Sequence, residues 1–407
     1  MTEKKRQLIF HWLYREWGGA QIYFIAIMKA ARADWNIVVV IPRTSSAEIL
    51  RYLDQIDVKY EFIDAFIDLD PAPTIKRKLT RHWSRIRSEI ASLRFLRRFD
   101  LREDILHVET SPWVSWMYLT ALSICGANVF VTLHNALPDA PAWRVVLWKA
   151  RMQLVSRLPG FHIFTSNKDT KNKFKGWVQD AFWDKIPLTY TCVNPPEIDA
   201  VLRGDFDRNA ARRQLNIDEQ SFVVISVGQF IDRKGRWVFL DAAKLAIEQN
   251  PDIQFVWVTP NLPSTADTER ITDYGLGDRF QLVLSSSIGS TRHDILSFFR
   301  IADVFALPSF VEGLPIALLE AMAMGLPSIS TNINAIPEAI IDGETGVLIG
   351  AGDSAALAES ILALRDDAQL CQRLSANGRT FVTERFDERE ASRIAINAYK
   401  ECFSDAN

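Results

Sequence analysis

Short apolar runs rich in β-branched residues alternate with segments of helical periodicity along the whole chain. This alternation is typical of parallel sheets that are covered by helices on both faces. The strands expected in the first half lie at 8–10, 37–41, 57–60, 105–108, 129–133 and 162–166. Those expected in the second half lie at 222–227, 255–258, 281–284, 303–308, 327–330 and 346–349. The expected fold class is therefore α/β, with two doubly wound, Rossmann-like domains.

The length of 407 residues also favours two domains, because single hydrophobic cores rarely grow beyond roughly 250–300 residues. The segment VNPPEID (193–199) is the expected join, since Pro195 and Pro196 cannot continue a ladder or a helix. The predicted domains are residues 1–194 and residues 195–386.

Cysteine usage and the N-terminal sequence indicate the cellular compartment in which the protein works. Cys125, Cys192, Cys371 and Cys402 show no paired metal-ligand spacing, which fits a reducing cytosol. The N-terminal MTEKKRQLIF has too short an apolar stretch for a signal peptide. The uncharged run within 110–138 is interrupted by glycine and asparagine, so it predicts a buried helix followed by a buried strand rather than a membrane span. We expect a cytoplasmic protein.

Charge is distributed unevenly along the chain. Residues 1–194 hold 28 Lys and Arg against 19 Asp and Glu, whereas the remainder holds 19 against 31. A basic domain attracts anionic surfaces or anionic acceptors. No nucleic-acid partner is expected.

The basic residues concentrate between Lys76 and Arg98, which contain nine Lys or Arg and one acid, Glu89. Apolar residues recur there every three or four positions, at Ile75, Leu79, Trp83, Ile86, Ile90, Leu93 and Leu96. The pattern predicts an amphipathic helix over 75–98. One interpretation is docking at an anionic membrane, at its inner face, with the helix at 142–158 contributing. The other is an ordinary helix with its stripe buried in the domain and its cations in water.

Open α/β sheets bind ligands at the carboxyl ends of their strands. In the first half, WGGAQ (17–21) follows a strand and precedes a helix, so Gly18 and Gly19 allow close approach of a phosphate to free N–H groups, or form a simple tight turn. His134 follows the strand VFVTL, where its near-neutral pKa suits proton transfer or a hydrogen bond to a sugar. A structural, hydrogen-bonded histidine is the alternative.

In the second half, VGQFIDRKG (227–235) places Arg233 and Lys234 where two cations can hold a diphosphate, or lie in solvent at a helix start. The segment PSFVEGLPIALLEAMAMGLP (308–327) is more specific. Glu312 precedes a Gly-Leu-Pro turn whose N–H groups can point at phosphate near a helix N-terminus. Glu320 lies about two helical turns further on, among apolar residues, where a carboxylate can take two ribose hydroxyls.

Two glutamates with seven residues between them, followed by IPEAIIDGETGVLI (336–349), resemble glycosyltransferase family 4. That family comprises retaining enzymes of the GT-B fold, in which two Rossmann-like domains face a central cleft. The resemblance is strong over about 220–350 and weaker over WGGAQ, VTLHN and NPPEID. It implies an acceptor-binding first domain, a donor-binding second domain and a final helix, 387–402, that packs back on the first domain.

The resemblance also implies roles for particular residues. The implied catalytic set is His134 beside the anomeric carbon, Glu312 at hydroxyls of the donor sugar, and Arg233 with Lys234 at the diphosphate. The implied donor-binding set is Gly18, Gly19, Gln229, Gly313, Leu314, Pro315 and Glu320. Two departures stand out, since the family often has arginine where Gln229 stands and usually has paired glycines where Asn334 and Ala335 stand.

The implied reaction transfers a sugar from a nucleotide-diphosphate sugar, with UDP favoured, to a hydroxyl of a glycan, glycolipid or lipid-linked acceptor in envelope polysaccharide or lipopolysaccharide synthesis. No cofactor and no metal are expected, because basic side chains can neutralise the leaving diphosphate and no Asp-x-Asp pair is placed to hold a divalent ion. Two alternatives remain: a nucleotide-sugar epimerase of the same fold, and a catalytically silent scaffold that binds a nucleotide sugar or partners an active transferase.

Overall fold

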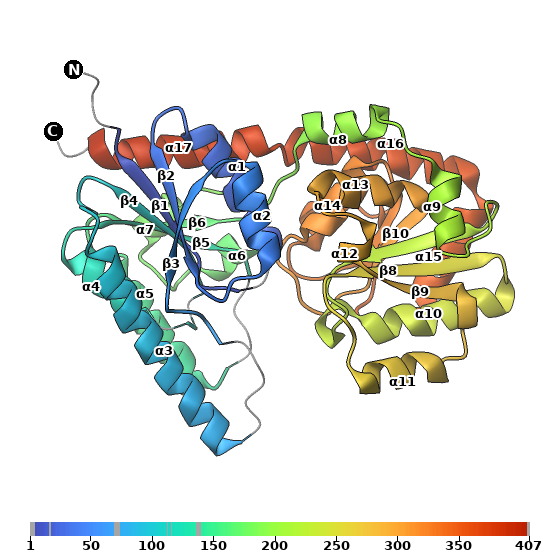
Figure 1. Cartoon of the computed structure of the whole chain (residues 1–407), viewed down its shortest axis with the longest axis horizontal. Helices are drawn as coiled ribbons and strands as arrows, with labels where there is room; N and C mark the ends of the chain where they lie inside the picture. Colours follow the sequence, from blue (N-terminus) through green and yellow to red (C-terminus); the bar gives the residue numbers. More distant parts are fainter. Residues whose placement is uncertain are drawn as a thin grey trace. The chain divides into compact units, whose positions relative to one another are not determined.

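The computed structural model describes residues 5–15, 18–68, 74–111, 113–114, 116–135 and 140–404, and it divides into two compact units (Figure 1). Unit 1 comprises Met1–Thr191 and Glu388–Asn407, and unit 2 comprises Cys192–Asp387. The chain thus enters unit 2 three residues before the join expected at 194/195 and returns to unit 1 for its last helix.

Unit 1 is built on a six-stranded parallel sheet in the order β3-β2-β1-β4-β5-β6. Its strands are β1 Gln7–His11, β2 Asn36–Pro42, β3 Lys59–Ile63, β4 Ile105–Glu109, β5 Asn128–Leu133 and β6 Phe161–Thr165. Its helices are α1 Gly19–Ala31, α2 Ala47–Gln55, α3 Ile75–Leu96, α4 Met117–Ile124, α5 Ala142–Val155, α6 Lys168–Lys173, α7 Asp180–Asp184 and α17 Glu388–Ser404.

Alternate residues of these strands supply two cores, one on each face of the sheet. In β1, Ile9 belongs to one core, whereas Leu8 and Phe10 belong to the other. Successive side chains of a strand point to opposite faces, so a sheet covered on both sides needs an almost continuous apolar run. This requirement explains why unbroken runs such as VFVTL predict buried strands.

The last helix of the chain, α17, lies against α1 in unit 1 (Figure 1). Tyr399 of α17 is fully buried, and its hydroxyl lies 2.5 Å from Nδ1 of His107 on β4. His107 also contacts Thr132 of β5, with 2.7 Å between Nε2 and Oγ1. A buried, hydrogen-bonded tyrosine therefore fixes α17 to the sheet of unit 1.

Unit 2 repeats the same strand order, β12-β11-β10-β7-β8-β9, again all parallel. Its strands are β7 Phe222–Val227, β8 Ile253–Thr259, β9 Phe280–Leu284, β10 Val304–Leu307, β11 Ser328–Thr331 and β12 Val347–Ile349. All twelve expected strands are present, so the predicted α/β class with two doubly wound domains is confirmed. In each sheet the strand order reverses at one point, between β1 and β4 and between β7 and β10, where such sheets bind ligands.

The α-helices of unit 2 are α8 Pro195–Arg203, α9 Arg208–Gln214, α10 Arg236–Gln249, α11 Thr265–Asp273, α12 Ser285–Ile288, α13 Arg292–Phe298, α14 Ile316–Ala323, α15 Ser354–Asp366 and α16 Ala368–Arg385. Four 3-10 turns, η1 Asp232–Lys234, η2 Gly277–Arg279, η3 Phe299–Ile301 and η4 Ile336–Glu338, complete its described helical elements. Pro195 and Pro196 mark the join as expected, since they continue no preceding helix or strand. They are the first residues of α8, where proline's missing N–H costs nothing, and Asn194 caps them by accepting from Glu197 N at 3.0 Å.

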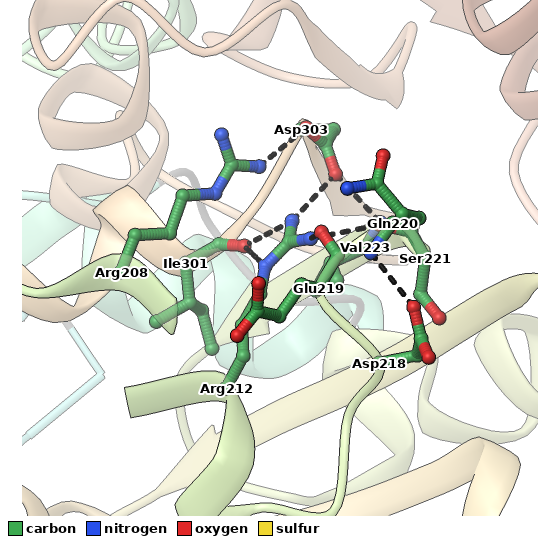
Figure 2. A network of polar contacts seen from close by, with 9 residues as sticks. All are labelled: Arg208, Arg212, Asp218, Glu219, Gln220, Ser221, Val223, Ile301 and Asp303. Atoms are coloured by element: carbon green, nitrogen blue, oxygen red, sulfur yellow. Dashed lines mark hydrogen bonds and ion pairs between the residues drawn. The ribbon is translucent and has the colours of Figure 1, made fainter. Parts of the chain in front are cut away.

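A buried arginine holds three segments of unit 2 together. Figure 2 shows Arg212 of α9 donating to the carbonyl oxygen of Ile301, to those of Glu219 and Ser221, and to Asp303. Its side chain is 2% exposed, so each of these bonds replaces one that water would make. The network ties α9 to the starts of β7 and β10 and so fixes the strands that carry the site at their other ends.

The uncharged run in 110–138 contains α4 followed by β5, as its pattern predicts, although Pro112, Ser115 and 136–139 lie outside the described residues. Among the helices that the structure describes, none is long and apolar enough to cross a membrane.

Candidate functional site

The strand-order reversal of unit 2 brings two loops together at the carboxyl ends of β7 and β10. The loop after β7 turns through Gly235, which has φ 74° and lies so close to Pro308 that a Cβ there would be 1.8 Å from the Pro308 carbonyl oxygen. Only glycine fits this approach. The backbone of Arg233 accepts a hydrogen bond from Phe310 N at 2.8 Å, which joins the two loops directly.

Glu312 is the centre of this site. Its carboxylate is 6% exposed and lies 2.6 Å from Nζ of Lys234 and 3.4 Å from a terminal nitrogen of Arg233. Ser309 donates its hydroxyl to the same carboxylate at 2.7 Å. The structure thus brings together three residues of the implied catalytic set, Glu312, Arg233 and Lys234. Removing one partner of a buried ion pair leaves the other charge buried without compensation, which destabilises the protein. We therefore treat these side chains as one cluster.

The N-terminus of α14 lies directly beyond Glu312 in the sequence. Within the described part of the chain, no hydrogen bond takes up the N–H groups of Gly313 and Leu314, although both residues are buried. Pro315 occupies the N-cap position, and no acidic side chain lies in the first turn. Unpaired N–H groups at the positive end of a helix are a suitable environment for a phosphate oxygen.

The loop after β11 supports Glu312 from the other side. Asn334 has φ 44°, in the left-handed region that asparagine tolerates better than most residues, and its Oδ1 accepts from Glu312 N at 3.2 Å. Asn334 therefore adopts a glycine-like backbone and adds a hydrogen bond that glycine lacks. Ala335, the second departure from the family pattern, is fully buried with φ −92°, a conformation that needs no glycine.

Glu320 lies on α14 and is paired with a residue that the sequence does not single out. Its Oε1 lies 2.5 Å from a terminal nitrogen of Arg292, whose Nε donates to Glu197 of α8 at 3.0 Å. Burial raises the pKa of Glu320, and Arg292 opposes that rise. Glu197, Arg292 and Glu320 are far apart in the sequence, so no local motif predicts that they come together.

Gln229 lies half-buried in the loop after β7, next to the buried Phe230, whose N–H donates to Thr259 Oγ1 at 3.3 Å. The loop backbone is anchored further by Trp257, which donates from Nε1 to the carbonyl oxygen of Gly228 at 2.8 Å. Gln229 supplies a neutral amide where the family resemblance implies an arginine, and Arg236 donates to the carbonyl oxygen of the following residue, Phe230, at 3.0 Å.

In unit 1, His134 follows β5 as the sequence predicts. Ser166 Oγ lies 2.9 Å from its Nδ1, while Nε2 is buried and finds no partner among the described residues. The ring packs edge-on against Tyr23, with 5.2 Å between ring centroids. Burial lowers the pKa of His134 to about 4, so the expected near-neutral pKa is wrong and the imidazole is uncharged at neutral pH.

Gly18 and Gly19 begin α1, but Trp17 of the WGGAQ motif lies outside the described residues. Gly18 is extended, at φ −164°, and a Cβ there meets no atom closer than 3.4 Å. The backbone itself therefore does not require glycine at position 18.

Glu109, which the sequence does not single out, lies close to the start of α1. Gln21 donates to Glu109, at the end of β4, across 3.4 Å. Burial raises the pKa of Glu109 to about 8. Burial and the negative charge of Glu109 together raise the pKa of Tyr14 well above its usual value. The only sequence signal is a polar residue at the carboxyl end of a buried strand, which is weak by itself. No cluster of three or more potential metal ligands occurs in the described ranges.

Comparison with known proteins gives matches that are strongest in unit 2. Residues 207–381 match the family model described as "Glycosyl transferases group 1". A D-inositol 3-phosphate glycosyltransferase of Paenarthrobacter aurescens is 29% identical over 216 residues, which are 52% of each chain. The Escherichia coli UDP-Gal:alpha-D-GlcNAc-diphosphoundecaprenol alpha-1,3-galactosyltransferase is 32% identical over 191 residues, 46% of each chain. The chain thus matches about half the length of these curated relatives.

The fold matches solved structures over almost the whole chain. A glycosyltransferase from Rickettsia africae aligns with a TM-score of 0.75 and 16% identity, covering 98% of this chain and 99% of the other. Anabaena Alr3699/HepE, solved with UDP-glucose, aligns with a TM-score of 0.74 and 18% identity over 97% and 99% of the two chains. The chain has the GT-B fold, and its residues 207–381 match the group 1 glycosyl transferases.

Proposed function

We propose that this chain is a retaining glycosyltransferase that transfers a sugar from a nucleotide-diphosphate sugar to a hydroxyl acceptor. The observation that carries the proposal is the Lys234–Glu312–Arg233 cluster beside the N–H groups of Gly313 and Leu314, which have no partner among the residues that the structure describes. The group 1 match over the same segment and the glycosyltransferase names of the relatives support it.

The cluster suits a leaving diphosphate. Lys234 and Arg233 can neutralise the negative charge that grows as the bond to the anomeric carbon breaks, and the two N–H groups can bind phosphate oxygens. Preorganised donors of this kind stabilise a charge that develops in the transition state. The proposed chemistry therefore runs on fixed cations and backbone dipoles and requires no metal ion.

Glu312 is proposed for hydroxyls of the transferred sugar and Glu320 for the ribose. Glu312 already accepts from Lys234 and Ser309, so a sugar hydroxyl would join an existing network rather than an isolated carboxylate. Glu320 shares Arg292 with Glu197, which keeps the carboxylate in place among apolar neighbours. Gln229 and Pro315 complete the proposed donor contacts, with Gly18 and Gly19 near phosphate or acceptor.

For His134 we propose a hydrogen bond from the neutral ring to a substrate hydroxyl. The buried Nε2 lacks a partner within the described chain, which is unusual for a polar atom in a protein interior. A pKa of about 4 makes the ring a poor proton acceptor at neutral pH. In the proposed retaining reaction, the acceptor proton passes to the departing phosphate rather than to the protein.

The proposed donor is a UDP-sugar, and the proposed acceptor is a glycan, glycolipid or lipid-linked sugar of the cell envelope. The E. coli relative is named for UDP-Gal and a diphosphoundecaprenol-linked sugar, and a structure of the same fold was solved with UDP-glucose. We also propose that the chain acts as a peripheral protein at an anionic membrane surface through α3.

Calorimetric titration with UDP, GDP, ADP and their glucose and galactose derivatives tests this function, together with a radiolabelled assay for donor hydrolysis and transfer. We expect one nucleoside diphosphate to bind best, with slow hydrolysis of its sugar form. Nucleotide-sugar binding without donor hydrolysis, and without transfer to acceptors in lipid or polysaccharide extracts, would favour the catalytically silent scaffold. Absence of binding to every nucleotide would contradict both.

A further inference from the structure

Two adjoining cavities lie between α3 and α5 of unit 1. One, of about 390 Å³, is lined by Lys78, Arg81, His82, Arg85 and Arg144. The other, of about 410 Å³, shares Arg81, Arg85 and Arg144 and is completed by Trp113, Trp143, Leu147, Trp148 and the Ala140–Pro141 segment. Figure 1 shows α3 as a long helix with α5 beside it. We call this surface the α3–α5 groove.

One face of α3 is buried in unit 1 near the end of the helix and lines the groove near its start. Along that face, Ser88, Glu89, Ser92 and Leu96 are buried in unit 1, at spacings of three and four residues. The same stripe continues toward the start of the helix as Arg85, His82 and Lys78, which line the cavity instead. The face that packs against the protein at one end therefore presents cations at the other.

The cations of the groove crowd one another. Burial lowers the pKa of the Arg85 guanidinium, Arg81 lowers it further, and Arg144 acts in the same direction. The groups that favour its charge are Tyr14 and Asp68. The Nε of Arg85 is buried and has no partner within the described residues. An anion between these side chains would relieve the repulsion and supply the missing acceptor.

The groove also exposes apolar side chains. Trp143 and Leu147 of α5 are 61% and 59% exposed, and both line the second cavity beside Arg81 and Arg85. On α3, Ile75, Leu79, Trp83 and Ile90 are all exposed as well. The interpretation in which this stripe is buried in the domain is therefore wrong for these four residues. Exposed apolar groups next to cations mark a surface that binds something amphipathic.

The outer end of α3 is held firmly enough to present this surface. Thr74 caps the helix by accepting from Arg77 N at 3.2 Å. Arg77 forms a two-pronged ion pair with Asp68, with N–O distances of 2.8 and 2.9 Å. Arg77 therefore anchors the helix and is left intact in the test below.

We propose that the α3–α5 groove docks the chain on an anionic membrane, with the phosphate of a lipid head group in the cationic cavity and Trp143 and Leu147 at the level of the head groups. A soluble phosphate would satisfy the cations but leave the indole and leucine in water. A phospholipid leaflet satisfies both, since tryptophan favours the interface and cations favour anionic lipid. The proposal rests on the proposed function only for the membrane association of α3, which it assigns to one groove and one kind of ligand, and nothing in it depends on nucleotide binding.

The test is co-flotation of the full chain with phosphatidylcholine vesicles with and without 30 mol% phosphatidylglycerol at about 0.1 M salt. The groove variant is Arg81→Gln/Arg85→Gln/Arg144→Gln. Its matched control is Arg87→Gln/Arg94→Gln/Arg97→Gln, which removes three exposed charges outside the cavities, two on α3 and one at its C-cap. A second variant, Trp143→Ser/Leu147→Ser, changes exposed side chains and leaves the charge unaltered.

We expect wild type to bind only the anionic vesicles and the groove variant to lose more than about tenfold in affinity, with the control losing less than about threefold. The serine variant should also weaken binding while its circular dichroism stays that of wild type. Equal loss in the groove and control variants would overturn the proposal, because general basic charge would then suffice. Inorganic phosphate that raises the melting temperature without any vesicle binding would overturn it in favour of a soluble anion.

Nucleotide binding, measured on the same samples, separates this test from the proposed function. Vesicle binding without nucleotide binding would leave the groove assignment standing and contradict the transferase proposal. Nucleotide binding without vesicle binding would contradict the groove assignment and the membrane role proposed for α3, and it would leave the transferase proposal standing.

Discussion

The same strand order occurs in both units, yet the two points where it reverses carry different chemistry. In unit 2, the loops after β7 and β10 bring Lys234, Arg233 and Glu312 into one ion-paired cluster beside a helix N-terminus. In unit 1, the equivalent edge after β1 and β4 carries Tyr14 and Glu109, both with raised pKa values. Identical topology thus sets where ligands can bind, and the loop residues decide whether a charged phosphate or a neutral hydroxyl is suited to that place.

The largest effect is expected from removing Lys234, the partly buried cation that pairs with Glu312. Lys234→Ala should weaken nucleoside diphosphate binding by about 100-fold, because a charge-assisted bond is lost and Glu312 keeps only Arg233 as an opposite charge. Calorimetry measures this, with Lys244→Ala, an exposed lysine on α10, as the control. Unchanged affinity in Lys234→Ala would show that the diphosphate binds elsewhere.

Removing the charge of Glu312 should separate turnover from affinity. Glu312→Gln keeps a polar group beside Ser309 but loses the carboxylate that a sugar hydroxyl would contact. We expect kcat to fall about 30-fold while UDP affinity changes less than about threefold. Steady-state kinetics and UDP titration together check this. A large loss of UDP affinity with kcat preserved would reverse the assigned roles.

The edge of unit 1 should reveal itself in the pH dependence of stability. A folded-state pKa of about 8 for Glu109, against 4.5 ordinarily, means that its contribution is present below pH 4.5 and is lost as pH rises toward 8. Between pH 6.5 and 8 the wild type should therefore lose about 2 kcal/mol more unfolding free energy than Glu109→Gln. Urea denaturation at the two pH values measures the difference, and equal losses would mean that Glu109 is ionised in the folded protein.

His134 should contribute to rate without contributing to the pH profile. With its pKa lowered to about 4, the ring does not titrate between pH 6 and 9. His134→Ala should lower kcat/KM about tenfold, the value of one hydrogen bond, and leave the midpoints of the pH profile in place. Loss of an ionisation near pH 6.5 in this variant would instead identify His134 as a proton acceptor.

The smallest effect is expected at Asn334. Asn334→Gly keeps the left-handed backbone and removes only the hydrogen bond to Glu312 N. The KM for the donor should rise no more than about threefold, corresponding to less than about 1 kcal/mol. Asn334→Ala should raise the donor KM more, because alanine does not adopt φ 44° easily. An equal rise in the two variants would mean that the left-handed backbone of Asn334 does not matter for donor binding.

The sequence predicts the fold well because each strand is buried on both faces and must be continuously apolar. It also predicts that Arg233, Lys234 and Glu312 follow strands of one sheet, at the edge where ligands bind, but it does not predict the ion pairs among them. It misses Arg292 and Glu109 because their partners are brought near only by tertiary folding. The lowered pKa of His134 depends on burial, which no local spacing records.

Hydrogen exchange tests the contrast between the two edges most directly. If unit 2 holds the diphosphate, UDP should slow amide exchange in 308–320 and 228–236 and leave 105–111 unchanged, because the N–H groups of Gly313 and Leu314 would acquire phosphate partners. Protection confined to the edge of unit 1, with 308–320 exchanging as in the free protein, would contradict the assignment of the nucleotide to unit 2.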